Sequence, residues 1–124
     1  MAKVEKCLSG LDATLHQTEG KKILVLADML ELGRRSRMLH ENAGRWAAQI
    51  HPDAVLTYGK QARWISRRVR FFDRHAFVEH FSSRADLHRQ LSRIVGRGDT
   101  VLVKGSRGMK MEETVNFLKS RMKE

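Results

Sequence analysis

Short hydrophobic runs alternate along the chain with segments in which hydrophobic residues recur every three or four positions. The runs have the length and composition of β-strands, and the recurring spacing is typical of helices that bury one face. The runs that predict strands cover residues 23–27, 54–58, 76–81 and 100–104. The periodic segments that predict helices cover residues 4–20, 36–50, 61–69, 82–96 and 109–122. Strands that alternate with helices predict right-handed crossovers and a parallel sheet.

The fold predicted from this order is α/β, with one Rossmann-like three-layer domain over residues 1–124, a mostly parallel sheet and helices on both faces. The first strand, Ile23–Ala27, is apolar throughout, so we expect it at the centre of the sheet. Ser36 and either Ser82 or Ser83 are expected to cap helices. A strand order of third, second, first, fourth would make the first and last strands neighbours and bring the loops that follow them to one crevice.

The residues after the last strand form the main candidate site. Lys104, Gly105, Ser106 and Arg107 place two cations and a hydroxyl at a glycine turn, just before the segment that predicts the last helix. A carboxylate or phosphate there would accept hydrogen bonds from backbone N–H groups, from the Ser106 hydroxyl and from the forked Arg107 side chain. The alternative is a glycine turn with solvated cations.

Two carboxylates follow the first strand. Asp28 and Glu31 would orient a substrate amine, a metal-bound water or the cations of the last loop. In the alternative interpretation Asp28 caps its turn and Glu31 is solvated. For Glu31 the sequence favours the solvated role, and for Asp28 both roles stay open.

The formal net charge of +10 would suit a polyanionic partner such as nucleic acid. The possible polyanion patch consists of Arg63, Arg67, Arg68 and Arg70. Trp64, which lies among them, would either stack a base or lean on the sheet. The alternative is that these arginines form solvated helix faces, and the sequence favours that alternative over specific recognition.

Composition and motifs exclude several kinds of site. The six histidines show no metal-ligand spacing and Cys7 is the only cysteine, so neither a metal site nor an internal disulfide is expected. The sequence contains no nucleophile elbow and no P-loop, so no catalytic residue is assigned. It shows no secretory signal and no apolar run of about 20 residues, so we expect a cytoplasmic chain without a membrane span.

Three segments together resemble the C-terminal domain of the Mur ligases. They are Ile23–Gly33 (ILVLADMLELG), followed by His40 and Gly44, then Asp53–Gly59 (DAVLTYG), and Asp99–Glu112 (DTVLVKGSRGMKME). The likeness covers nearly the whole chain in the right order. Within the family it is greatest to the ligases that add D-alanyl-D-alanine to a UDP-muramoyl tripeptide. Ala27 departs from the family pattern, which has glycine at that position.

The resemblance implies an ATP-dependent ligase of peptidoglycan synthesis, in which a substrate carboxylate becomes an acyl phosphate and is attacked by the amine of D-alanyl-D-alanine. It also implies that the P-loop and the magnesium ligands belong to a central domain. This chain is therefore expected to need the N-terminal and central ligase domains as partners. On its own it is not expected to bind ATP tightly. The Asn-rich segment that contacts the nucleotide in the family is not found here. By resemblance, Lys104, Ser106 and Arg107 face the cleft, with Asp28 beside them. The competing hypothesis is a free-standing basic module that binds anions or nucleic acid.

Overall fold

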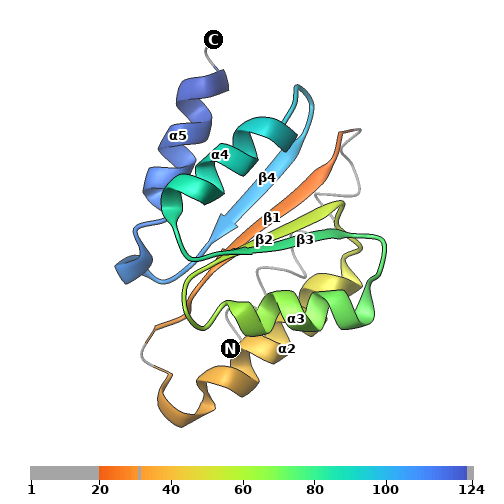
Figure 1. The fold of residues 1–124 in the computed structure, drawn as a ribbon, viewed down its shortest axis with the longest axis vertical. Coiled ribbons are helices and arrows are strands. Elements are labelled where there is room, and N and C mark those ends of the chain that lie inside the picture. The colour runs from red at the N-terminus through yellow and green to blue at the C-terminus, as the bar shows by residue number, and fades with distance from the viewer. Residues whose placement is uncertain (1–19, 31, 123–124) are drawn as a thin grey trace.

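The computed structural model describes residues 20–30 and 32–122, which form one four-stranded sheet with helices on both faces (Figure 1). The strands are β1 (Lys22–Ala27), β2 (Ala54–Tyr58), β3 (Phe77–Phe81) and β4 (Thr100–Lys104). The helices are α2 (Ser36–Gln49), α3 (Arg63–Phe72), α4 (Arg84–Ile94) and α5 (Glu112–Met122), with short 3-10 turns η1 (Gly33–Arg35) and η2 (Arg107–Met109). The helix expected over residues 4–20 and the side chain of Glu31 lie outside the described residues.

The sheet has the order β3-β2-β1-β4 and every strand pair is parallel. This confirms the predicted α/β fold, the predicted strand order and the central place of β1. Residues Ile23 to Ala27 of β1 are each no more than 3% exposed, because neighbouring strands cover both edges and helices cover both faces. The chain reverses its direction of travel across the sheet between β1 and β4, which creates a switch point at their carboxyl ends.

Each face of the sheet has its own hydrophobic core. Leu24, Leu26 and Val55 pack with residues of α2 and α3, whereas Ile23, Val25 and Leu56 pack with residues of α4 and α5. The strict alternation of neighbouring residues between the two cores follows from the two-residue repeat of a strand. Trp46 packs against the first core, as its place on the helical stripe predicts.

Several element boundaries differ from those predicted. Ser83 caps α4 by accepting a hydrogen bond from the Asp86 N–H, as expected, but Ser36 caps nothing. Ser36 is itself the first residue of α2, and its N–H already donates to the Gly33 carbonyl of η1. The last helix was predicted to begin at Met109 and instead begins at Glu112, because Lys110 adopts a left-handed conformation (φ 51°) that separates η2 from α5.

Candidate anion-binding site

The loops that follow β1 and β4 meet at the switch point of the sheet. The Leu30 N–H donates to Ser106 Oγ at 2.7 Å, and the Ser106 N–H donates to the Asp28 carbonyl at 3.1 Å. These two bonds join segments that are more than 70 residues apart in the sequence. The expectation that both loops share one rim of the sheet is therefore confirmed.

Several backbone N–H groups at this rim already donate within the protein. The sequence predicts that free N–H groups of the turn would bind an anion, but those of Ser106, Met109 and Lys110 all donate to carbonyls within the protein. These three groups therefore already have partners in the fold, and anion binding by the backbone of the turn stays a prediction. Lys104 and Arg107, in contrast, make no ion pair with any described residue. Ligand binding by these two cations and by Ser106 stays a prediction.

Gly105 lets the cationic turn approach β1 closely. A Cβ at this position would lie 2.8 Å from the Ala27 Cβ and 3.0 Å from the Met111 Cγ. Both distances are shorter than van der Waals contact between carbon atoms. A glycine is required here because there is no space for a side chain between the two loops.

Asp28 caps the start of α3, a role that differs from the capping of its own turn considered from the sequence. Its side chain is 4% exposed, and Oδ1 accepts hydrogen bonds from the N–H groups of Gln61 at 2.9 Å and Ala62 at 2.6 Å. These N–H groups belong to the start of α3, where a negative charge is favourable to the helix dipole. Asp28 thus ties β1 to α3, while a direct role in ligand binding stays a prediction.

His40 holds the loop after β1 from inside the protein. It is fully buried, its Nε2 accepts a hydrogen bond from the Met29 N–H at 3.0 Å, and its Nδ1 lies 2.6 Å from the Ser36 carbonyl. Because Nε2 accepts, the ring hydrogen must be on Nδ1, which donates to that carbonyl. His40 appears in the sequence only as part of the family resemblance, without a role, although its position on the inward face of α2 is a signal of burial.

Arg84 holds the link between η2 and α5, a contact that the sequence does not predict. From the first turn of α4, its guanidinium donates to the carbonyls of Met109 at 2.5 Å and Lys110 at 2.9 Å. It also lies 3.3 Å from a Glu113 carboxylate oxygen. These contacts fix the link between η2 and α5, and nothing in the local sequence around Arg84 indicates them.

The four arginines of the predicted polyanion patch do not share one environment. Arg68 pairs with Glu41 at 2.7 Å, and Arg70 donates to the Val78 carbonyl at 3.0 Å. Arg63 and Arg67 both lie over the ring of Trp64, 4.8 Å from its centroid. Arg68 and Arg70 therefore have partners within the protein, and nucleic-acid binding by the patch stays a prediction.

Two histidines near the helical layers have pKa values below the ordinary value. Burial lowers the pKa of His80, whose Nδ1 lies 2.8 Å from Thr57 Oγ1, although the charge of Asp28 opposes this effect. Burial and the charge of Arg84 lower the pKa of His88, which lies 2.8 Å from Thr114 Oγ1. Each ring lies within hydrogen-bond distance of a threonine hydroxyl group, so we assign both histidines a structural role.

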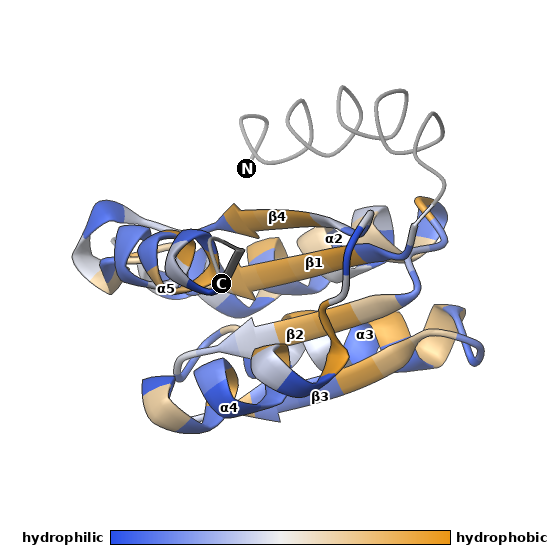
Figure 2. Cartoon of the chain, turned by 90° about the horizontal axis from the view of Figure 1, so that it is seen from above, coloured by the Kyte–Doolittle hydropathy of each residue, from blue (hydrophilic) through white to orange (hydrophobic). Residues whose placement is uncertain are grey.

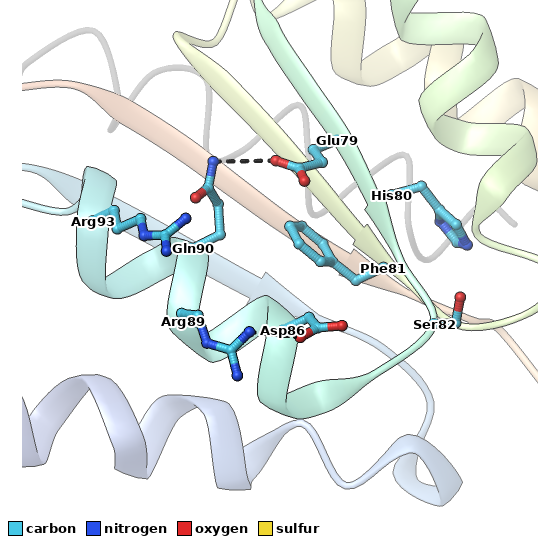
Figure 3. A pocket seen from close by; sticks show the side chains of 8 residues that line it. All are labelled: Glu79, His80, Phe81, Ser82, Asp86, Arg89, Gln90 and Arg93. Carbon is cyan, nitrogen blue, oxygen red and sulfur yellow. Dashed lines mark hydrogen bonds and ion pairs between the residues drawn. The ribbon is translucent and has the colours of Figure 1, made fainter.

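A separate open depression of about 350 Å³ lies between β3 and α4 (Figure 3). Glu79 and Gln90 are hydrogen-bonded across it at 3.1 Å, and Asp86 pairs with Arg89 along one wall. None of the residues of the cationic turn lines this depression. Its polar groups largely satisfy one another, so it is not the predicted anion site.

Two further findings concern only the part of the chain that the structure describes. No three histidine, cysteine, aspartate or glutamate side chains there lie close enough together to hold a metal ion. None of its helices is both long enough and apolar enough to cross a membrane.

The parallel sheet, the helices on both faces and the junction of the two loops at the switch point define a Rossmann-like α/β domain. The family model described as "Mur ligase, glutamate ligase domain" matches residues 1–107 of the chain. The chain therefore belongs to this family, and it matches only the C-terminal domain of the complete enzymes.

Individual relatives agree with this assignment. The chain is 39% identical to the UDP-N-acetylmuramoyl-tripeptide--D-alanyl-D-alanine ligase of Bacillus subtilis, with 89% of this chain and 25% of that enzyme covered. It is 36% identical to the ligase of the same name from Escherichia coli, with 84% and 22% covered. The crystal structure of the MurF ligase from Thermotoga maritima in complex with ADP shares the fold (TM-score 0.73, 24% identity, 96% of this chain and 26% of that chain covered). The chain spans about a quarter of the length of these relatives.

Proposed function

We propose that the chain is the closing domain of a cytoplasmic ATP-dependent ligase that joins D-alanyl-D-alanine to a UDP-muramoyl tripeptide, with N-terminal and central ligase domains as its partners. The observation that carries the proposal is the junction of the two loops at the switch point. There Ser106 is bonded to both Asp28 and Leu30, and Lys104 and Arg107 have no ion pair among the described residues. A basic rim of this kind suits a domain that closes over an anionic substrate.

Lys104 and Arg107 would bind a carboxylate or phosphate oxygen at the mouth of the crevice. Ser106 Oγ already accepts from Leu30, so its own hydrogen is available to donate to the same anion. The supporting bonds to the loop after β1 fix the hydroxyl in place. Holding an anion in one orientation for reaction is a large part of what a closing domain contributes.

The described residues fit ATP and magnesium only in part. The cationic turn can contact a phosphate group, but the sequence has no P-loop to cradle one, and no acidic cluster that would hold a metal ion exists among the described residues. Magnesium and most of the nucleotide contacts are therefore assigned to the other domains of the ligase.

A chimaera tests the proposal. The C-terminal quarter of the Bacillus subtilis ligase is replaced by this chain, and ADP release is measured with UDP-muramoyl tripeptide in the presence and absence of D-alanyl-D-alanine. We expect release that depends on D-alanyl-D-alanine, and none from the same enzyme truncated before its C-terminal domain. Single amino acids such as glutamate serve as alternative acceptors, because they distinguish the neighbouring ligase specificities.

Matched variants of the chimaera locate the activity. Lys104→Ala combined with Arg107→Ala should lower activity about 100-fold or more, since two charge-assisted contacts are lost. Arg93→Ala combined with Arg97→Ala removes the same charge from exposed positions outside the site and should leave activity within a factor of about two. A folded chimaera without acceptor-dependent ADP release would contradict the proposal, as would equal effects of the two double variants.

The second candidate function is a free-standing module that binds nucleic acid. Fewer arginines support it than the sequence suggests, because Arg68 and Arg70 have partners within the protein. The observation in its favour is the group of Arg37, Arg63 and Arg67, all of which lie within 5 Å of the Trp64 ring centroid. Binding to single-stranded RNA that weakens steeply with added salt would support it. Absence of binding at low ionic strength would remove it.

A further inference from the structure

The outward side of α3 and the corner after it form a surface that the proposed ligase role does not use. α3 contains four arginines and no acidic residue, and it ends in Phe71 and Phe72, which are 71% and 50% exposed. Phe77, at the start of β3, is 45% exposed, and Arg74 lies in the loop between them. These four residues, Phe71, Phe72, Arg74 and Phe77, are called the α3 corner. In Figure 2 this corner combines hydrophobic segments with a polar loop.

The backbone of the α3 corner is fixed, so the exposure of its rings is a property of the fold. The Asp73 N–H donates to the Val69 carbonyl at 2.8 Å, and Asp73 Oδ1 accepts from the N–H groups of His75 and Ala76. The rings of Phe71 and Phe72 pack edge to face, with centroids 5.0 Å apart. Exposed aromatic residues grouped at one corner are unusual for a surface that contacts only water.

The charges beside these rings are mainly cationic. The exposed acidic neighbour is Asp53, whose carbonyl accepts from the Phe77 N–H at 2.9 Å and whose carboxylate accepts from the Lys22 N–H at 2.7 Å. Arg74 makes no ion pair with any described residue, and Arg70 uses its guanidinium to donate to the carbonyl of Val78. Asp73 is 7% exposed and is occupied by the turn, while Glu41 is paired with Arg68. The surface therefore combines exposed apolar rings with an excess of positive charge.

We propose that the α3 corner binds the surface of membranes that contain anionic phospholipids. The three phenylalanine rings would enter the interface between headgroups and acyl chains, and the arginines would lie beside lipid phosphates. Exposed rings beside the unpaired Arg74 suit an anionic membrane surface. The corner lies at the amino ends of the strands, opposite the anion-binding rim, so the proposal is independent of the ligase role.

Nucleic acid fits this surface less well. A single strand needs open aromatic faces along a groove. No ring of the α3 corner lines the depression beside β3. The positive charge and the exposed rings outside any described groove therefore favour a membrane.

Vesicle flotation with the full 124-residue chain tests the proposal. Vesicles of phosphatidylcholine alone are compared with vesicles that also contain phosphatidylglycerol, at low and at physiological salt. We expect binding to the anionic vesicles that is at least about tenfold stronger than to the neutral ones and that weakens with salt. Phe71→Ser combined with Phe72→Ser should reduce the partition coefficient about tenfold, and Arg74→Glu about fivefold or more.

Two control variants make the same chemical changes elsewhere. Met38→Ser replaces a side chain on α2 that is 50% exposed, and Arg93→Glu reverses a charge on α4, across the sheet. Both should bind vesicles within a factor of about two of the parent chain. Circular dichroism spectra confirm that each variant is folded.

Three outcomes would overturn the proposal. The first is absence of binding to anionic vesicles at low salt, and the second is equal binding by the corner and control variants. The third is loss of RNA binding or of self-association, instead of vesicle binding, when Phe71 and Phe72 are replaced, which would assign the surface to nucleic acid or to a second copy of the chain.

Discussion

Gly105→Ala is expected to weaken the domain because it puts a methyl group where β1 already has one. The new Cβ would lie 2.8 Å from the Ala27 Cβ and 3.0 Å from the Met111 Cγ. Met111 has a flexible side chain and can yield, but Ala27 is part of the central strand and cannot move without disturbing the sheet. Overpacking of this kind costs about 1–3 kcal/mol of the free energy of unfolding.

The clash can be separated from other effects by a second substitution. Ala27→Gly removes the opposing methyl and should itself cost about 1–2 kcal/mol, from lost burial and added backbone freedom. In the double variant the nearest atom of residue 27 is its Cα at 3.6 Å, which is ordinary contact, and the flexible Met111 side chain at 3.0 Å is the remaining close neighbour. We therefore expect the double variant to be about 1–2 kcal/mol more stable than the sum of the single effects predicts.

Urea unfolding followed by circular dichroism gives the four free energies of this cycle. Gly96→Ala is the control, because a Cβ there would meet only Asp99 Oδ2 at 3.7 Å, and it should change stability by less than about 0.5 kcal/mol. If Gly105→Ala were no worse than this control, or if the two changes at 27 and 105 were additive, the close contact between the loops would not be what requires glycine.

Other contacts of the site lead to further predictions. Arg84→Ala should lower the free energy of unfolding by about 2 kcal/mol, because two backbone carbonyls lose a charged donor. Arg89→Ala, the control in an exposed ion pair, should change it by less than about 0.5 kcal/mol. Equal losses of the two variants in urea unfolding would contradict the role of Arg84 in holding these carbonyls. His40→Ala should cost about 2–4 kcal/mol and speed hydrogen exchange at the Met29 amide, and an unchanged exchange rate there would refute the proposed bond. Folding lowers the pKa of His88, so as the pH falls the unfolded chain binds a proton at this residue before the folded chain does. The stability linked to this pKa difference is complete above pH 6.5 and is lost as the pH falls through the folded pKa. Thermal midpoints measured from pH 7.5 to 4.5 should therefore fall less steeply in His88→Gln than in the parent chain, and parallel curves would argue against this linkage.

The strand order could be predicted because its determinants are local and redundant. Five consecutive apolar residues, Ile23 to Ala27, are tolerated only where both faces of a strand are covered, which places β1 inside the sheet. The helices between the strands then impose parallel pairing. The meeting of the loops at Asp28 and Ser106 follows from that topology, without knowledge of any side-chain contact.

The partners of individual polar groups could not be predicted in the same way. Whether Asp28 faces a ligand or the start of α3 depends on the positions of Gln61 and Ala62, more than 30 residues away. The start of α5 depends on the backbone conformation of Lys110, which is an unusual conformation for that residue type. Arg84 reaches its carbonyl partners only after α4 has packed beside η2. Each of these contacts is a product of the assembled fold.

Some of the cationic side chains form ion pairs within the protein and others do not, and this difference separates charges that stabilise the fold from charges that can bind a partner. Arg68 and Arg84 are held by Glu41 and Glu113, so their charges serve the fold. Lys104 and Arg107 lie at the carboxyl end of the sheet and Arg74 at the amino end, and none of the three has an ion pair among the described residues. β1 has six residues, so the two ends are separated by about 20 Å, which is more than twice the Debye length of about 8 Å at physiological salt. An anion bound at one end therefore has little electrostatic effect on the other, and a single polyanion is not needed to explain both groups.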